Sequence, residues 1–144
     1  MKYQEIKGNL FKVSNEYTLT HCISADCKMG AGIATLFVKH NPYMRKTLQE
    51  MNPKIGDALY YNWEGQYGVI NLITKQLYFH KPTREDFNLT ILKLKETMEY
   101  YEIKKLAMPL IGSGLDRLSW KESSKFIQET FTDTDVEILV VVKE

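Results

Sequence analysis

Two residues of the sequence combine reactive side chains with positions at the ends of apolar segments. Lys75 closes the apolar run that ends in "LIT", and Asp116 follows the glycine turn "IGSGL". An unprotonated lysine amine is a nucleophile, and a carboxylate can take its proton or pass one to a leaving oxygen. Burial or a neighbouring positive charge favours the unprotonated amine. The residues alone favour a simple ion pair, because lysines at strand ends are common and usually solvated.

Two glycine turns, "KMGAGIA" and "LIGSGLD", each follow a predicted strand. Such turns expose backbone N–H groups that bind anions, and a helix starting after the first turn adds a favourable partial charge. An isolated Gly-x-Gly is more often only a tight turn, but two of them after strands favour a phosphate site. Neither turn has the Lys-Ser/Thr of a Walker A loop or the third glycine of a dinucleotide fingerprint, which argues against ordinary nucleotide hydrolysis.

The order of the predicted elements places both turns at the carboxyl ends of strands. Strands alternating with helices predict an α/β sandwich in which helices cover both faces of a mixed sheet. Ligands bind such sheets beyond the carboxyl ends of the strands. The hydrophobic patterns predict strands at 2–7, 18–23, 58–63, 67–74 and 136–142 and at the start of "KKLAMPLIG", and helices at 31–40, 41–51, 84–103 and 120–131.

Local signals refine these elements. "KYQEIK" alternates polar and apolar residues like an edge strand, whereas the β-branched run "VEILVVV" suits a buried strand. The turn signal Glu64-Gly65-Gln66 separates two strand-like runs and predicts that they form a hairpin or are adjacent strands. Ser119 and Glu122 form a capping box, which predicts where the last helix begins.

Length and composition indicate one globular domain covering residues 1–144, with 44% hydrophobic and 26% charged residues. Nineteen basic and eighteen acidic residues leave a formal charge of +1, so no overall field recruits nucleic acid or a membrane, and an anionic ligand must be bound locally. The segment "MKYQEIKGNL" lacks a signal-peptide core, and no stretch approaches the roughly 18 apolar residues of a membrane span. A cytoplasmic location is expected.

The cysteines and histidines give weaker signals. Cys22 and Cys27 lack the CxxC spacing and the further ligands of a zinc or redox site, so we expect reduced packing residues and no metal. His21 lies in an apolar strand, where we expect a core histidine rather than a catalytic one. His80 either borders a ligand or shapes the loop before Pro82.

Five segments, in this order and at this spacing, closely resemble macrodomains of the terminal ADP-ribose protein glycohydrolase branch: "KGNLF", "HCISADCKMGAGIA", "LITK", "HKPT" and "MPLIGSGLDRLSW". The resemblance covers nearly the whole chain and implies a single macrodomain, a three-layer α/β/α sandwich around a mixed central sheet. Common macrodomains that hydrolyse ADP-ribosyl esters carry an asparagine-rich motif after the second strand. This chain has "HCISADCKMG" there, so the resemblance implies the chemistry of its own branch.

The resemblance also implies an ADP-ribose cleft between the two glycine loops, with the diphosphate on the backbone of residues 30–33 and 113–115. Lys75 would attack C1 of the distal ribose and form a covalent lysyl-ADP-ribose adduct, and Asp116 would be its acid/base partner. No cofactor is implied. The residues expected to bind ADP-ribose are Gly8, Asn9, Leu10, Ser24, Gly30, Ala31, Gly32, Ile33, Thr74, Ile111, Gly112, Ser113, Gly114 and Leu115.

Asn9 departs from the family pattern, which has an aspartate at this position that accepts a hydrogen bond from the adenine amino group. Asparagine keeps an acceptor oxygen but loses the charge. We expect adenine binding to survive and to weaken by about 1 kcal/mol, the usual difference between charged and neutral hydrogen bonds.

The implied function is an enzyme that removes ADP-ribose from acidic side chains, or from nucleic-acid ends or bases. Alternatives are an O-acetyl-ADP-ribose deacetylase, an ADP-ribose 1''-phosphate phosphatase, and a non-catalytic ADP-ribose-binding module in which Lys75 only contacts ribose. DNA is the weaker acceptor, because the near-neutral chain has no basic footprint. The expected partner is therefore ADP-ribose or an ADP-ribosylated protein, bound by a monomer without a membrane.

Overall fold

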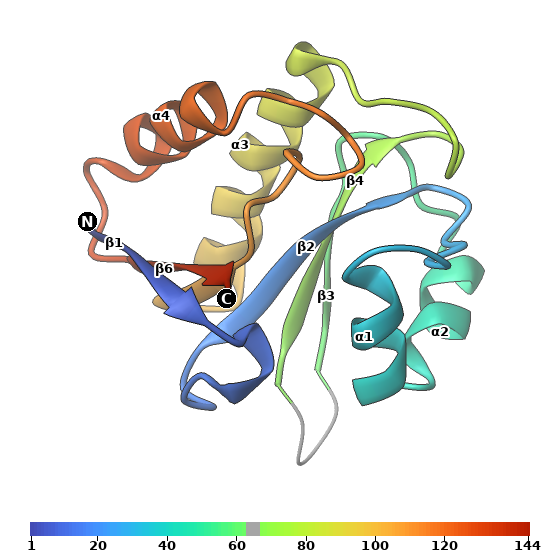
Figure 1. Cartoon of the computed structure of the whole chain (residues 1–144), viewed down its shortest axis with the longest axis horizontal. Coiled ribbons are helices and arrows are strands. Elements are labelled where there is room, and N and C mark those ends of the chain that lie inside the picture. Colours follow the sequence, from blue (N-terminus) through green and yellow to red (C-terminus); the bar gives the residue numbers. More distant parts are fainter. Residues whose placement is uncertain (63–66) are drawn as a thin grey trace.

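The structure, a computed structural model that describes residues 1–62 and 67–144, is built on a six-stranded sheet of order β1-β6-β5-β2-β4-β3 (Figure 1). All neighbouring strands are parallel except β3, which is antiparallel to β4. The sheet is therefore mixed, as predicted. The strands are β1 (Lys2–Gly8), β2 (Thr18–Ser24), β3 (Ala58–Tyr61), β4 (Val69–Lys75), β5 (Lys105–Met108) and β6 (Glu137–Lys143). The helices are α1 (Ala34–His40), α2 (Met44–Glu50), α3 (Arg84–Tyr100), α4 (Trp120–Phe131) and the 3-10 turn η1 (Leu10–Lys12).

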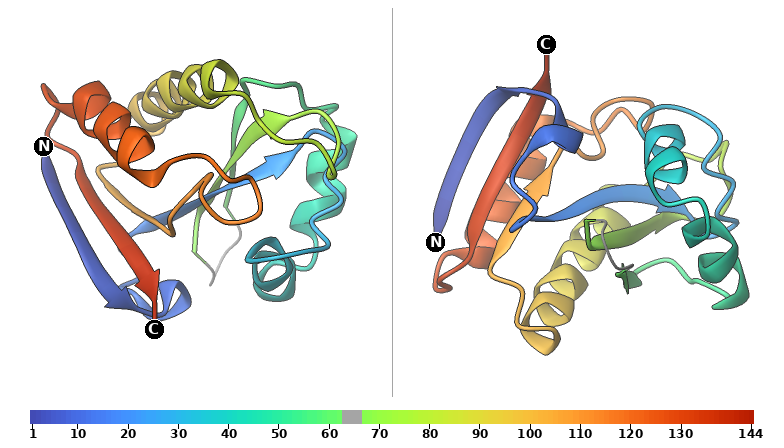
Figure 2. Two further views of the ribbon diagram at one scale, coloured as in Figure 1. Left: turned by 45° about the horizontal axis from the view of Figure 1, so that its top comes forward. Right: turned by 90° about the horizontal axis from the view of Figure 1, so that it is seen from below.

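Helices cover both faces of the sheet, which gives the predicted three layers (Figures 1 and 2). Phe87 of α3 and Phe131 of α4 are fully buried against one face. Phe37 of α1 and Met44 of α2 are fully buried against the other. Burying a side chain of this size stabilises the fold by about 1.5–3 kcal/mol. No helix in the described residues has the length and apolar character needed to cross a membrane.

The strand predictions hold in their main features. β1 is an edge strand and β6 is an interior strand with a mostly buried sequence, as their patterns predicted. β3 and β4 form the predicted antiparallel pair, whereas the turn signal Glu64-Gly65-Gln66 lies outside the described residues.

Three helix ends follow from local backbone geometry. Ser119 accepts a hydrogen bond from the Glu122 N–H at 3.3 Å, so the predicted cap of α4 is confirmed. α1 begins at Ala34 and not at residue 31, because Gly32 has a φ of 61° and cannot be part of a right-handed helix. α3 ends at Tyr100, before the predicted residue 103, because Glu102 has a φ of 56° and closes the helix in a left-handed conformation.

A gap in the sheet follows from the short length of β5. This strand has four residues, whereas its neighbours β2 and β6 have seven each. β2 pairs with β5 only at Thr18 and Leu19. Pro109 follows β5 directly and has no N–H to continue the strand pairing. The carboxyl-terminal halves of β2 and β6 are therefore not joined by backbone pairing through β5.

Candidate functional site

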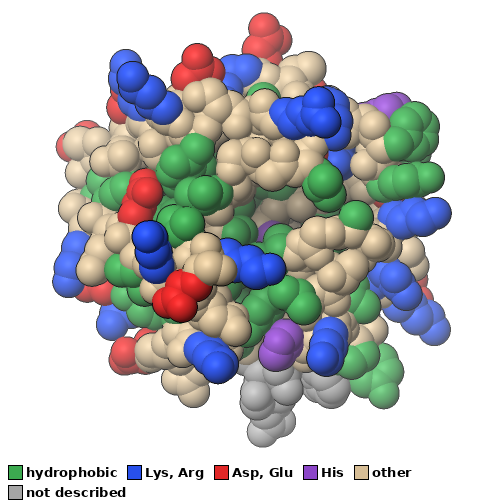
Figure 3. Space-filling model, in the orientation of Figure 1, with side chains coloured by type: hydrophobic (Ala, Val, Ile, Leu, Met, Phe, Trp, Pro, Cys, Tyr) green, Lys and Arg blue, Asp and Glu red, His purple; other side chains and the backbone are tan. Residues whose placement is uncertain are grey.

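A cleft of about 480 Å³ lies at this gap, between the loop after β2 and the loop after β5. Its size is in the range of small-molecule sites. Figure 3 shows the corresponding hollow near the centre of the molecular face. The cleft brings together eleven of the predicted site residues: Ser24, Gly30, Ala31, Gly32, Ile33, Lys75, Ile111, Gly112, Gly114, Leu115 and Asp116.

The first loop presents a row of unused backbone donors to the cleft. Among the described residues, the N–H groups of residues 30–33 donate no hydrogen bond to the protein. Met29, with a φ of 49°, and the fully buried Cys27 hold the loop against the core. Consecutive N–H groups of this kind form an anion-binding nest. This wall therefore fits a phosphate group, as the glycine turn predicted.

The second loop is held in shape by its own backbone. Leu118 N–H donates to the Gly112 carbonyl at 2.7 Å, and Gly112 has a φ of 75°. Ser113 turns away from the cleft, because both its N–H and its hydroxyl donate to the Leu110 carbonyl. Gly114 and Leu115 line the cleft, and within the described chain their N–H groups donate to no protein acceptor. The free N–H groups that this loop presents to the cleft therefore include those of residues 114–115.

Lys75 and Asp116 meet in the cleft. Lys75 Nζ lies 2.7 Å from Asp116 Oδ1, and the two side chains are only 13% and 11% exposed. The pairing of β2 with β4 contains a bulge, since Ile23 pairs with Ile73 but Ser24 pairs with Lys75. Bulges next to active sites re-aim a side chain, and this one directs Lys75 into the cleft. A hydrogen bond of this length can carry a proton from the amine to the carboxylate, so the pair can act as base and nucleophile.

The other potentially reactive groups near the cleft are held in unreactive forms. Burial, together with the negative charge of Asp116, raises the pKa of the Cys22 thiol far above neutrality. Burial and the nearby Asp26 charge raise the pKa of Cys27 to about 11. A neutral thiol is a poor nucleophile, so the lysine amine is the better candidate.

His21 is a core residue, as predicted. It is fully buried, its ring stacks on Phe37 with centroids 3.7 Å apart, and burial lowers its pKa to about 4. Its Nε2 donates to Asn71 Oδ1 at 2.7 Å, because the Asn71 amide group itself donates to the Leu59 carbonyl. His80 Nδ1 accepts a hydrogen bond from the Leu77 N–H at 3.3 Å, which favours its role in shaping the loop.

Five predicted site residues do not line the cleft: Gly8, Asn9, Leu10, Thr74 and Ser113. Asn9 Oδ1 already accepts the Phe11 N–H at 2.9 Å and caps η1. Leu10 and Thr74 are buried. Gly8 is paired with Lys143, which does line the cleft.

Sequence reasoning did not assign ten of the residues that line the cleft to the site, and Lys28, Tyr78 and Lys143 are among them. Lys143 ends β6 at the same edge of the sheet, and Lys28 and Tyr78 form part of the rim. Lys28 Nζ lies 4.5 Å from the centre of the Tyr78 ring, a cation–π contact. Lys143 could have been predicted as a site residue from its position at the carboxyl end of a strand.

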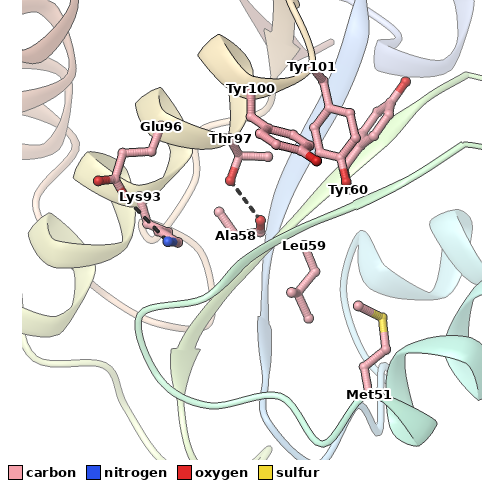
Figure 4. A pocket seen from close by; sticks show the side chains of 9 residues that line it. All are labelled: Met51, Ala58, Leu59, Tyr60, Lys93, Glu96, Thr97, Tyr100 and Tyr101. Atoms are coloured by element: carbon pink, nitrogen blue, oxygen red, sulfur yellow. Dashed lines mark hydrogen bonds and ion pairs between the residues drawn. The ribbon is translucent and has the colours of Figure 1, made fainter.

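A second pocket, of about 270 Å³, lies between β3 and α3 (Figure 4). Its polar groups already pair with one another: Lys93 Nζ with Glu96 Oε2 at 3.3 Å, and the Thr97 hydroxyl with the Ala58 carbonyl at 2.9 Å. Three tyrosines, Tyr60, Tyr100 and Tyr101, fill much of the remaining wall. This pocket has no glycine loop with a row of backbone donors among the residues that line it, so the cleft at the glycine loops is the candidate site.

In residues 1–62 and 67–144, no group of three or more His, Cys, Asp or Glu side chains could hold a metal ion. The cleft is lined by backbone N–H groups and three lysines, Lys28, Lys75 and Lys143, which suit an anion.

Comparison with known proteins gives relatives over nearly the whole chain. No protein-family model matches. The chain is 40% identical over 135 residues to the ADP-ribose glycohydrolase OARD1 of Homo sapiens, covering 94% of this chain and 88% of that protein, and equally to OARD1 of Bos taurus.

Solved structures share the fold. The macrodomain of Mycobacterium tuberculosis DarG has a TM-score of 0.88 at 20% identity and covers 96% of each chain. The structure of Thermosipho africanus DarTG in complex with ADP-ribose has a TM-score of 0.87 at 19% identity, covering 99% of this chain and 42% of that one.

Proposed function

The chain belongs to the macrodomain family, in the branch of the ADP-ribose glycohydrolases, and on this basis we propose that it releases ADP-ribose from modified acidic side chains through Lys75 and Asp116. It is an ADP-ribosyl hydrolase. One observation carries the assignment of the two residues: Lys75 Nζ and Asp116 Oδ1 lie 2.7 Å apart in a cleft walled by two glycine loops.

The loops supply the binding of the ligand. The free N–H groups of residues 30–33 face the N–H groups of Gly114 and Leu115 across the cleft, and these donors suit the two negative charges of a diphosphate. Lys28 and Lys143 add positive charge to the lining. The diphosphate held there would place the distal ribose toward Lys75 and Asp116.

The reaction proceeds in two steps. Asp116 takes a proton from the Lys75 ammonium group, and the free amine attacks C1 of the distal ribose. The bond from C1 to the acceptor oxygen breaks and its electron pair leaves with the acceptor, which takes the proton from Asp116, so that Asp116 is again a carboxylate and Lys75 carries ADP-ribose as a secondary ammonium group. Asp116 then assists a water molecule to attack C1, the bond from C1 to Nζ breaks, and the amine regains its proton. The net change is one water consumed, with a free carboxylic acid and ADP-ribose formed.

The acceptor could differ without a change in the cleft. O-acetyl-ADP-ribose, ADP-ribose 1''-phosphate and ADP-ribosylated nucleic-acid ends present the same ADP-ribose and the same C1 atom. A non-catalytic ADP-ribose-binding module would use the same loops but would not need the proton path from Lys75 to Asp116.

Mass spectrometry of the enzyme and its products tests the proposal. Wild type, Lys75→Ala and the control Lys93→Ala, which removes a paired lysine outside the cleft, are incubated with mono-ADP-ribosylated protein. We expect wild type and Lys93→Ala to release ADP-ribose and to show an ADP-ribose mass on Lys75. Lys75→Ala should still bind free ADP-ribose. It should cleave ADP-ribose from the modified protein at least about a thousandfold more slowly than the wild type.

Two results would reject parts of this proposal. Release by Lys75→Ala at the wild-type rate would exclude Lys75 as the nucleophile. Binding of ADP-ribose without release by the wild type, on protein and on the small esters alike, would identify a binding module.

A further inference from the structure

Asp26 lies behind the wall of the cleft and holds together residues that form it. Its Oδ1 accepts hydrogen bonds from the Ser24 hydroxyl and from the Lys28 N–H, the latter at 3.1 Å, and its Oδ2 accepts the Tyr78 N–H at 3.0 Å. Ser24, Lys28 and Tyr78 all line the cleft, whereas Asp26 does not. The carboxylate therefore contacts residues of the wall without being part of the cleft lining itself.

The Asp26 contacts extend the pairing of β2 with β4 beyond the ends of both strands. Ala25 N–H donates to the Lys75 carbonyl at 2.9 Å, and Asp26 N–H donates to the Gln76 carbonyl at 3.3 Å. The bond from Tyr78 to Asp26 is the next tie along the same two segments. Three successive ties thus fix the chain on the carboxyl side of Lys75 to the loop that leads into residues 30–33.

The hydrogen bonds that Asp26 accepts favour the ionised form of its carboxyl group. Burial by itself would raise its pKa, but the hydrogen bonds from Ser24, Tyr78 and Lys28 outweigh burial and lower the pKa below its ordinary value. Asp26 is therefore ionised at neutral pH and accepts bonds with both oxygens. A charged acceptor makes such bonds about twice as strong as a neutral one.

We propose that Asp26 is a positioning residue that fixes the Lys75 amine relative to the diphosphate-binding loop by tying Tyr78 to Ser24 and Lys28. The inference rests on the proposed function of Lys75. Attack at C1 requires that the amine and the bound ADP-ribose keep one relative position, and a displacement of about 1 Å lowers the rate by about a hundredfold. Because Asp26 bonds to segments on both sides, it sets that position without touching the substrate.

Asp26→Asn is the first test. The amide keeps one acceptor oxygen but presents an N–H₂ group at the other position, so one of the two backbone N–H groups loses its partner. We expect kcat on mono-ADP-ribosylated protein to fall about 10- to 100-fold, with the Kd for free ADP-ribose changed less than about threefold. A merely structural role would lower the melting temperature and leave kcat per folded enzyme unchanged, so both are measured.

A double-mutant cycle isolates the bond between the segments. Tyr78→Pro removes the backbone N–H that Asp26 accepts, and Tyr78→Ala, which keeps that N–H and removes the ring, is its control. We expect Tyr78→Pro to lose kcat beyond Tyr78→Ala, and Asp26→Asn to cost kcat in the Tyr78→Ala background but little further in the Tyr78→Pro background. If Asp26→Asn fails to fold, the comparison of Tyr78→Pro with Tyr78→Ala still tests the bond.

The outcomes separate the two proposals. If Lys75→Ala loses activity but Asp26→Asn keeps kcat within about twofold of the wild type, the inference about Asp26 is overturned and the proposed function stands. Equal losses of kcat and of ADP-ribose affinity, or independent effects in the cycle, also overturn it. A wild type without hydrolase activity overturns the proposed function and the inference together.

Discussion

Replacing Gly112 by alanine is expected to destabilise the fold through the second loop of the cleft. Gly112 has a φ of 75°, a left-handed backbone conformation that costs an alanine about 1–2 kcal/mol. A Cβ at this position would lie 2.9 Å from Phe87 Cε2 and 3.3 Å from Leu118 Cδ1. Phe87 belongs to α3 and is fully buried in the core, so its ring cannot move aside freely. Overpacking of this kind costs about 1–3 kcal/mol.

The two terms together predict a loss of about 2–5 kcal/mol in the free energy of unfolding. For a chain of this length, 1 kcal/mol corresponds to about 2–4 °C, so the melting temperature should fall by roughly 10 °C. The control is Gly114→Ala in the same loop, where φ is not positive and a Cβ meets no atom within 4 Å. That variant should unfold within about 0.5 kcal/mol of the wild type.

Thermal and urea unfolding of the three proteins, followed by circular dichroism, give the comparison. A Gly112→Ala protein that melts within about 2 °C of the wild type would refute this reasoning, because it would mean that Phe87 and the loop absorb both the methyl group and the change in backbone conformation. Equal losses in Gly112→Ala and Gly114→Ala would contradict it as well, since only the first position has a close contact.

Two further expectations concern pH and charge. Stability should fall as pH drops from about 6.5 toward 4, because unfolded His21 takes up a proton near 6.5 and the buried side chain only near 4. The loss should reach about 2 kcal/mol by about pH 5; urea midpoints of the wild type and His21→Gln measure it, and an equal fall in both proteins would contradict this assignment. Lys143→Gln should weaken ADP-ribose binding about two- to fivefold and reduce the salt dependence of binding. The control Lys7→Gln, on the neighbouring strand and outside the cleft, should leave both quantities unchanged. Calorimetry at two salt concentrations measures both variants, and equal effects would place Lys143 outside the site.

Much of the site was predictable because its residues lie at, or shortly after, the carboxyl ends of strands. Lys75 and Asp116 are 41 residues apart in sequence, but Lys75 ends β4 and Asp116 lies in the loop after β5, and both strands belong to one sheet with a common carboxyl edge. The glycine turns were readable for the same reason, and Gly32 and Gly112 do adopt positive φ angles.

Other features depend on contacts that the sequence does not display. The bulge that directs Lys75 depends on the pairing of β2 with β4, which no local pattern shows. The turn geometry after Leu110 decides that Ser113 points away from the cleft, although it lies between two glycines. Lys143 reaches the cleft only because β6 extends past β5, and strand lengths are poorly fixed by hydrophobic pattern alone. For Asp26 a local signal did exist, since an aspartate that bonds the N–H two residues later is a common turn former.

The four-residue length of β5 has a consequence for how the molecule handles its ligand. The cleft occupies the space of unmade strand pairing, and its two sides, β2 and β6, are each hydrogen-bonded to a further strand, β4 and β1. Widening this slot would break the pairing of β5 with β2 and with β6, which joins the two sides next to the cleft. The recognition surface is therefore preorganised, and little ordering entropy is lost when ADP-ribose enters. Discrimination among acceptors is left to the loops at the rim, which can vary in sequence without altering the sheet that forms the slot.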